Sequence, residues 1–260
     1  MNVNLAERAH NHNWKLDPIV RSLLDTDFYK LLMLQFIWKN FPAIHVTSET
    51  TNRTTHVRLA EHIPAAALIE QMEHVRQLRF GKSELIWLAG NTFYGTRSIF
   101  EPAFLGWLEN GFRLSDYDVI EQSGQLVLRF AGLWTEVTMW EIYGLALMSE
   151  MKTRAALGRL SELELDVLYA RAKTKLWDKI EKLRRFPAVR ISEFGTRRRH
   201  SFLWQEYVVQ AMRAGLGESL SGTSNTFLAY KHDLEAMGTN AHELPMALAA
   251  LANSDEELHS

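Results

Sequence analysis

The residues best suited to chemistry lie in a short run just before position 200. Phe194, Gly195, Thr196 and Arg197 are followed by two further arginines and a histidine. An aromatic ring can stack on a flat ligand, glycine lets the backbone come close, and guanidinium groups bind phosphate through paired hydrogen bonds. The run therefore predicts a site for a flat ring and a phosphate. A solvated basic loop or a non-specific RNA-binding patch is the alternative, which three arginines alone would favour.

A second polar segment, GTSN at positions 222–225, comes before a predicted helix. Its backbone N–H groups and the hydroxyls of Thr223 and Ser224 suit an anion such as a carboxylate, because a helix N-terminus carries unpaired donors and a positive dipole end. Clusters of this composition are more often ordinary helix caps. By itself, the segment is a weak indication of a binding site.

His242 lies in a third polar segment, at positions 238–245, again just before a predicted helix. A neutral imidazole there could act as a base or a nucleophile. A lone histidine near a helix start is usually structural, and Glu243 cannot be assumed to contact it because adjacent helical residues point apart. No zinc-type spacing, Walker loop or dinucleotide glycine fingerprint occurs in the sequence.

Each of these segments follows a short extended stretch and precedes a helix. The stretches are predicted at 189–191, near 219–220 and at 234–237. Strands joined through helices run parallel, and in an α/β barrel the site forms from the loops after the strands. Because three such units cannot close a barrel of eight strands, we expect only part of one.

The earlier part of the chain mixes helix and strand, which predicts an α/β fold: an amino-terminal α/β domain (1–137) followed by the first units of an irregular, incomplete α/β barrel (138–260). Asp25 and Thr26 are predicted to cap a helix that runs through Phe28 to Ile37. Pro64 suits the first turn of another helix, and Gly124 suits a hairpin turn. The remaining expected elements are an extended stretch at 44–47, a short helix ending at 109–111, and helices at 137–151, 161–183, 201–214 and 247–252.

Composition narrows the class of protein. The formal net charge of -2 lacks the basic excess of a dedicated duplex nucleic-acid binder. With Cys 0 there is no thiolate nucleophile and no cysteine zinc site. The apolar stretch 31–38 is too short to cross a bilayer, and residues 1–14 lack the apolar core of a secretory signal. We therefore expect a cytoplasmic protein that binds neither membrane nor nucleic acid.

Taken together, five segments resemble the nicotinate phosphoribosyltransferase family, and they occur in the family's order over nearly the whole chain. Each segment alone would be a weak signal. The segments are LLDTDFYKLLMLQ (23–35), WTEVTMWEI (134–142), FGTRRRHS (194–201), GTSN (222–225) and GTNAHELPM (238–246).

The resemblance implies a type II phosphoribosyltransferase that works as a homodimer with shared active sites. Phe194 and a Tyr29 from the neighbouring subunit would hold the pyridine ring between them, and Arg197 would contact the ring or the nucleotide phosphate. Gly195, Thr196 and Thr223 would complete the substrate site. Nicotinate and phosphoribosyl pyrophosphate would be substrates and ATP a co-substrate, with Mg²⁺ bound to the phosphorylated ones.

Two residues carry the finer expectations of this resemblance. Ser224 stands where the related nicotinamide-using enzymes have an aspartate, and a hydroxyl can donate to nicotinate where a carboxylate would repel it. His242 matches the histidine that ATP phosphorylates, so its role would be energetic. The alternative of nicotinamide specificity is weakened by Ser224. Family members continue into later barrel strands and phosphate-binding loops, which predicts that this chain is an amino-terminal portion and leaves open whether it is active alone.

Overall fold

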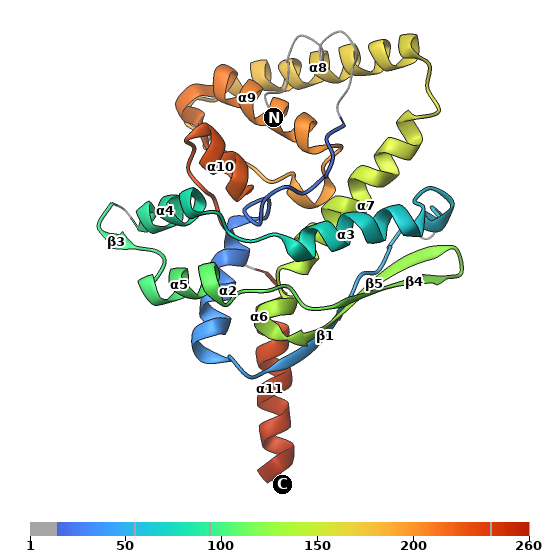
Figure 1. Ribbon diagram of the computed structural model, residues 1–260. Helices are drawn as coiled ribbons and strands as arrows, with labels where there is room; N and C mark the ends of the chain where they lie inside the picture. The colour runs from blue at the N-terminus through green and yellow to red at the C-terminus, as the bar shows by residue number, and fades with distance from the viewer. Residues whose placement is uncertain (1–14, 55, 94, 240, 260) are drawn as a thin grey trace.

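The computed structural model describes residues 15–54, 56–93, 95–239 and 241–259, with side chains to residue 253 (Figure 1). Positions 1–14, where we expect no export signal, and Asn240 of the third polar segment lie outside the described residues. The helices are α2 (Phe28–Asn40), α3 (Ala65–Gln77), α4 (Lys82–Gly90), α5 (Pro102–Asn110), α6 (Trp134–Val137), α7 (Trp140–Leu157), α8 (Glu162–Arg184), α9 (Phe202–Leu216), α10 (Thr226–His232) and α11 (Glu243–His259), with short 3-10 turns η1 (Leu59–Glu61), η2 (Thr196–Arg198) and η3 (Gly217–Ser219). The strands are β1 (His45–Glu49), β2 (Thr92–Phe93), β3 (Arg97–Ser98), β4 (Tyr117–Gln122), β5 (Gln125–Leu133), β6 (Ile191–Glu193) and β7 (Leu220–Thr223).

An antiparallel sheet in the order β1-β5-β4 forms the centre of the first half of the chain. The predicted hairpin is confirmed: Ser123 and Gly124 form its two-residue turn, with φ of 53° and 74°. A positive φ at both turn residues matches the twist of the two strands. Along β5, Leu126, Leu128 and Phe130 alternate toward the core and are buried, as the period of a half-buried strand requires.

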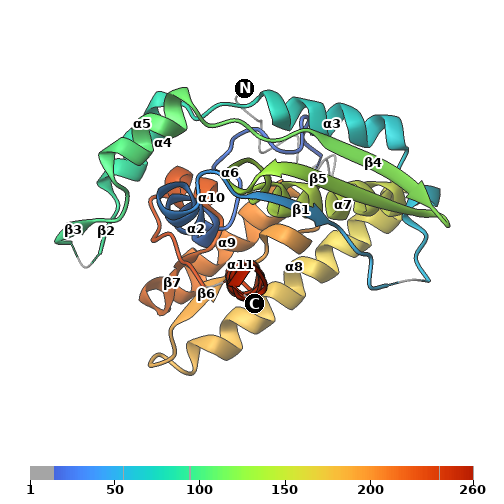
Figure 2. The same ribbon diagram turned by 90° about the horizontal axis from the view of Figure 1, so that it is seen from below.

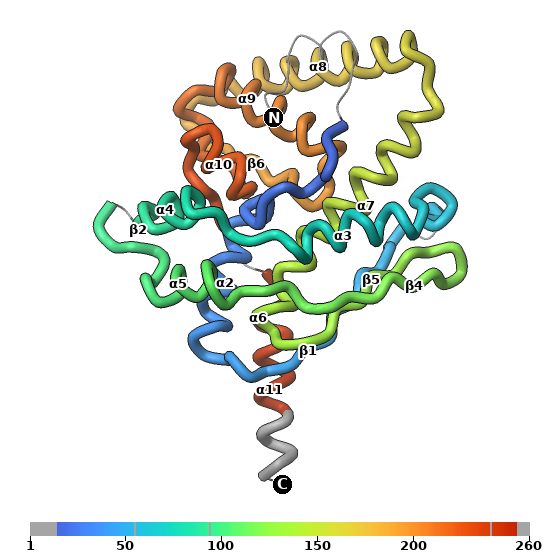
Figure 3. Tube along the Cα trace, viewed as in Figure 1, coloured from blue at the N-terminus to red at the C-terminus, as the bar shows by residue number. Residues whose placement is uncertain are grey.

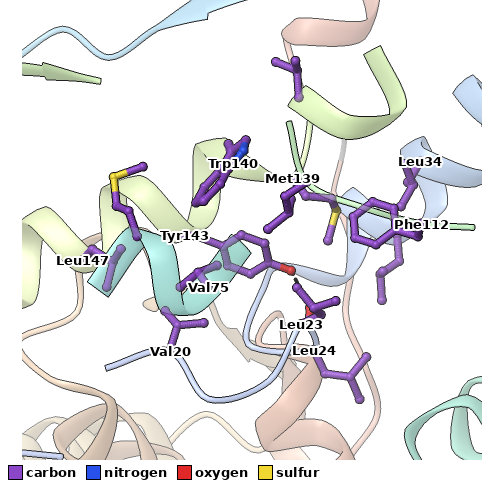
Figure 4. Packing of buried hydrophobic residues seen from close by; sticks show 14 of the residues in the cluster. Val20, Leu23, Leu24, Leu34, Val75, Phe112, Met139, Trp140, Tyr143 and Leu147 are labelled. Atoms are coloured by element: carbon purple, nitrogen blue, oxygen red, sulfur yellow. Dashed lines mark hydrogen bonds between the residues drawn. The ribbon is translucent and has the colours of Figure 1, made fainter. Parts of the chain in front are cut away.

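Helix α7 packs against this sheet and carries its apolar residues into the main core. The rings of Trp140 and Phe130 stack with centroids 5.1 Å apart and planes at 12°. Nearby, the buried Tyr143 hydroxyl donates to the Leu23 carbonyl at 2.6 Å (Figure 4). The main core thus includes residues from both sides of the expected division at 137/138, and that division stays a prediction.

The three extended segments that precede the polar loops run parallel, as predicted. β6 pairs with β7, and Thr223 of β7 forms a parallel bridge with Ala236 on its other side. Gly222 lets the third segment come close, because at its φ of +151° a Cβ would meet the Glu235 carbonyl oxygen at 2.1 Å. The chain is therefore a mixed α/β protein, and the strands within its described residues form no closed barrel.

Helix α11 takes a different course from α9 and α10. Its described side chains, to residue 253, lie on turns that extend away from the rest of the molecule (Figures 1 and 3), and in Figure 2 the helix is seen end-on. Leu244 and Ala247 in its first turns pack against Met33, Ile37 and Trp134. This apolar contact directs α11 toward the amino-terminal half instead of back over the parallel strands.

Several local predictions need correction. Asp27, not Asp25 or Thr26, is the N-cap of α2, and its side chain makes no capping hydrogen bond. Pro64 is the N-cap of α3 and so precedes its first turn. The helix expected at 137–151 is α7, which begins later and ends later, while α6, α4 and the β2-β3 hairpin were not predicted. None of the helices, over the residues described, is long and apolar enough to cross a membrane.

Candidate active site at the loops after the parallel strands

The start of α2 is held against the loop that follows β7. The backbone N–H of Phe28 donates to the Ser224 carbonyl at 2.8 Å, and the N–H of Thr226 donates to the Thr26 carbonyl at 2.8 Å. β6 lies beside β7, so the loop after β6 emerges at the same edge. Three segments far apart in the sequence, at 25–30, 194–199 and 222–225, therefore meet at one place.

The floor of this place is a buried polar network. Thr223 donates from its hydroxyl to the Glu193 carboxylate at 2.6 Å, and Gln205 Nε2 lies 3.2 Å from both Glu193 oxygens and 3.3 Å from Thr196 Oγ1. Burial raises the pKa of Glu193, against the opposing effect of the hydrogen bonds from Thr223 and Gln205. A Cβ at Gly195 would lie 2.3 Å from Glu193 Oε1, so a side chain there would force the Glu193 carboxylate to move. Thr196 and Thr223, expected to contact the substrate, are thus buried members of this network.

Arg199 is buried, contrary to the alternative of a fully solvated basic loop. Its two terminal nitrogens donate to the two oxygens of Asp25 at 2.6 and 2.8 Å, and the side chains are 1% and 3% exposed. Asn225 Nδ2 also donates to Asp25, at 2.8 Å. The Asp25 carboxylate, expected as a helix cap, instead joins the segment just before α2 to the loop after β6.

Arg197 remains partly accessible at this place, with 46% of its side chain exposed. Its Nη1 lies 3.1 Å from Glu141 Oε1, and its Nε lies 3.6 Å from Asp27 Oδ2. Burial acts to lower the pKa of Arg197, but the neighbouring Tyr29, Glu141 and Asp27 together raise it above its ordinary value. The Tyr29 ring is 5% exposed, and burial, followed by the charge of Glu141, raises the pKa of its hydroxyl.

Ser224 is fully buried, and its hydroxyl donates to Asp27 Oδ1 at 2.7 Å. A hydroxyl has a single proton to donate. In this arrangement that proton is already used, and Ser224 offers only its lone pairs to a further group. Asn225 accepts the backbone N–H of Leu228 at 2.9 Å, so the segment also caps α10, as its alternative interpretation predicted.

Phe194 and His242, the other expected site residues, are exposed. Phe194 is 48% exposed at the start of the loop after β6. His242 is exposed just before α11, and the neighbouring Glu243 accepts a hydrogen bond from the buried Lys30 of α2. The structure thus brings Tyr29 and Arg197 together, and joins the His242 loop to them through Glu243 and Lys30.

Charged residues inside apolar helices are a signal in the sequence that the predictions above did not include. Lys30, Glu141 and Glu150 stand in the apolar helices α2 and α7. Lys30 and Glu150 are fully buried, and Glu141 lies between Lys30 and Arg197. A charge at a core position of a helix is rarely buried without a partner. Its presence therefore indicates an ion pair that reaches another element.

Within the described part of the chain, no group of three or more His, Cys, Asp or Glu side chains is arranged to hold a metal ion.

The fold and the site define an α/β protein with an accessible cation and an exposed aromatic ring at the carboxyl ends of parallel strands. Residues 24–149 match the model of the nicotinate phosphoribosyltransferase N-terminal domain, and residues 189–259 match the model of the nicotinate phosphoribosyltransferase family. The chain belongs to the nicotinate phosphoribosyltransferase family, which confirms the resemblance inferred from its five segments.

Solved structures give the same assignment. The chain is 28% identical to a nicotinate phosphoribosyltransferase from Porphyromonas gingivalis, with a TM-score of 0.66 over 86% of this chain and 55% of that one. It is 27% identical to one from Vibrio cholerae, with a TM-score of 0.73 over 92% of this chain and 55% of that one. The chain thus spans just over half the length of these relatives.

Proposed function

We propose that this chain carries the nicotinate-binding part of a nicotinate phosphoribosyltransferase. The reaction joins nicotinate to 5-phosphoribosyl 1-diphosphate and, with ATP and water, gives nicotinate mononucleotide, diphosphate, ADP and phosphate, the first step of NAD synthesis from nicotinate. The parallel strands are proposed to be the first units of the incomplete barrel. The observation that carries the proposal is the half-exposed Arg197 at the meeting point of three family segments.

Arg197 supplies the positive charge that a carboxylate or phosphate needs. The exposed Phe194 ring offers one face for a pyridine ring. In the reaction, the pyridine nitrogen attacks the anomeric carbon of the ribose as the bond to diphosphate breaks, so positioning does most of the work. A homodimer in which the partner supplies Tyr29 is part of this proposal; in the single chain, Tyr29 is buried beside its own Arg197.

Selection for the acid follows from the charges around Ser224. An aspartate at this position would place a second carboxylate beside Asp27, which already accepts the Ser224 proton at 2.7 Å. The uncharged hydroxyl avoids the repulsion that such a second carboxylate would exert on the carboxylate of nicotinate. Because this proton is used, the attraction for nicotinate falls mainly to Arg197, which lies 3.6 Å from Asp27.

His242 is proposed to carry a transient phosphoryl group. An exposed imidazole nitrogen would attack the γ-phosphorus of ATP, ADP would leave, and water would later cleave the N–P bond. Replacing His242 with Asn should remove the stimulation by ATP and leave a slower basal reaction. The exposed His45 on β1 gives a matched control, since its replacement with Asn should leave the stimulation intact. Unchanged stimulation in the His242 variant would exclude this role.

The test of the whole proposal is product formation. The protein expressed from its complete coding sequence, and the isolated 260 residues in parallel, are incubated with labelled nicotinate, phosphoribosyl pyrophosphate, ATP and Mg²⁺. Nicotinate mononucleotide is the expected product, and its absence from the complete protein would refute the proposal. Nicotinamide in competition tests the alternative base. Salt-dependent RNA binding without any effect of nicotinate would support the RNA-binding alternative, for which the buried Arg199 is not available.

A further inference from the structure

Lys30 occupies a position that the reaction itself does not explain. Its side chain is 0% exposed, and its Nζ lies 2.6 Å from Glu141 Oε2 and 2.5 Å from Glu243 Oε2. A weaker contact reaches Thr138 Oγ1 at 3.5 Å. A buried ammonium group needs compensating charge, and here two carboxylates from different elements provide it.

Each of the two carboxylates uses its other oxygen for a second donor. Glu141 Oε1 accepts from Arg197 Nη1 at 3.1 Å, and Glu243 Oε1 accepts from Trp134 Nε1 at 2.7 Å. A continuous line of charged contacts therefore runs from Arg197 through Glu141 and Lys30 to Glu243, the residue next to His242. It joins the loop after β6 to the start of α11.

Such a line transmits changes because its centre, Lys30, is buried and the two carboxylates beside it are partly shielded from water. The side chains of Glu141 and Glu243 are 31% and 29% exposed, so charge interactions are stronger than at an open surface. If Glu243 loses its charge or moves, Lys30 is left with one carboxylate. The contact between Lys30 and Glu141 then changes, and the contact between Glu141 and Arg197 changes with it.

We propose that Lys30 is a positioning residue that couples the His242 loop to Arg197. The physical coupling stands on the contacts alone. The functional role of this coupling rests on the proposed function. A phosphoryl group on His242 would change the affinity for nicotinate beside Arg197, and nicotinate would change the stability of the phosphoryl group by the same factor, as linkage requires.

The first experiment measures the coupling without any catalysis. Backbone hydrogen exchange at 194–199 is followed in the protein, in Glu243→Gln, in Lys30→Met and in the double variant. We expect Glu243→Gln to change the exchange rate by about fivefold or more, the lower range of allosteric couplings. In the Lys30→Met background the same substitution should change it by a factor near one.

A matched control lies on the same helix. Lys39 of α2 pairs with Glu101 at 2.5 Å, but the two side chains are 56% and 46% exposed. Lys39→Met should leave the effect of Glu243→Gln at 194–199 intact. No effect of Glu243→Gln, or an equal effect with and without Lys30, would overturn the proposal. If Lys30→Met does not fold, Glu141→Gln takes its place in the cycle with the same expectations.

The second experiment uses the complete enzyme and separates coupling from a merely structural role. The KM for nicotinate is measured with and without ATP. The ratio of the two values should fall toward one in Lys30→Met and recover in part in Lys30→Arg, which keeps the charge. An unchanged ratio contradicts the coupling. If the unmodified enzyme makes no nicotinate mononucleotide, the proposed function fails, and the exchange cycle alone decides the role of Lys30.

Discussion

Replacing Arg199 with Met should destabilise the protein far more than the same change at Arg198. Arg199 and Asp25 form a paired hydrogen bond at 2.6 and 2.8 Å with side chains 1% and 3% exposed. Removing one member of a buried pair leaves the other charge uncompensated and costs about 3–5 kcal/mol. Arg198 is exposed, and its replacement should change the free energy of unfolding by less than about 0.5 kcal/mol.

Urea unfolding followed by tryptophan fluorescence measures both variants under identical conditions. The loss in free energy of unfolding appears as a lower urea midpoint, while the dependence of that free energy on urea concentration stays the same. A difference between the Arg199 and Arg198 variants below about 1 kcal/mol would refute the reasoning. The double change Asp25→Leu with Arg199→Met removes both charges and should recover part of the loss. A double variant no more stable than Arg199→Met alone would also contradict the argument from buried charge.

The cost of losing Arg199 should also depend on pH. Burial raises the pKa of Glu150, and the charge of Arg199, whose Nε lies 3.6 Å from Glu150 Oε2, acts to lower it. A carboxyl whose folded pKa is raised stabilises the fold while it is protonated, and loses that contribution as pH rises through the folded pKa. Without Arg199 the pKa of Glu150 rises further. The Arg199→Met variant should therefore be closer to the unmodified protein in mild acid than at pH 8.

Three further variants test the fold. Gly222→Ala should cost about 1–3 kcal/mol, because φ is +151° and a Cβ would meet the Glu235 carbonyl oxygen. Gly106→Ala in α5, with nothing within 4 Å of its Cβ, should instead stabilise by about 0.5–1 kcal/mol, and thermal unfolding that ranks the two alike would contradict this. Burial acts to raise the pKa of Glu206, but hydrogen bonds and charge from a histidine and a lysine on α10 lower it to about 2. A carboxyl whose folded pKa is depressed gives stability that is present above the unfolded value near 4.5 and is lost as pH falls toward 2. Glu206→Gln should therefore reduce the loss of stability between pH 4.5 and pH 2. An unchanged loss of stability over this range would contradict the role of the ion pairs.

Local patterns in the sequence were sufficient where neighbours along the chain decide the structure. The turn at Gly124, the alternation of Leu126 to Phe130 and the long helix α8 follow from turn chemistry and hydrophobic period. The order of polar loops after parallel segments was also correct, because parallel strands require crossovers. The two-residue strands β2 and β3 carry too little pattern to be predicted.

By itself, the sequence determined the family, the mixed α/β class and the residues that flank the loops, because these depend on residue types and their order. Only the tertiary structure decided the partners of each charge. Asp25 is an ion-pair partner of Arg199 instead of a cap, Ser224 donates its proton to Asp27, and Lys30 joins two carboxylates. The residues in these contacts are about one hundred to two hundred positions apart in the sequence. A buried charge pairs with the partner that packing brings close to it, and no local sequence pattern specifies that partner.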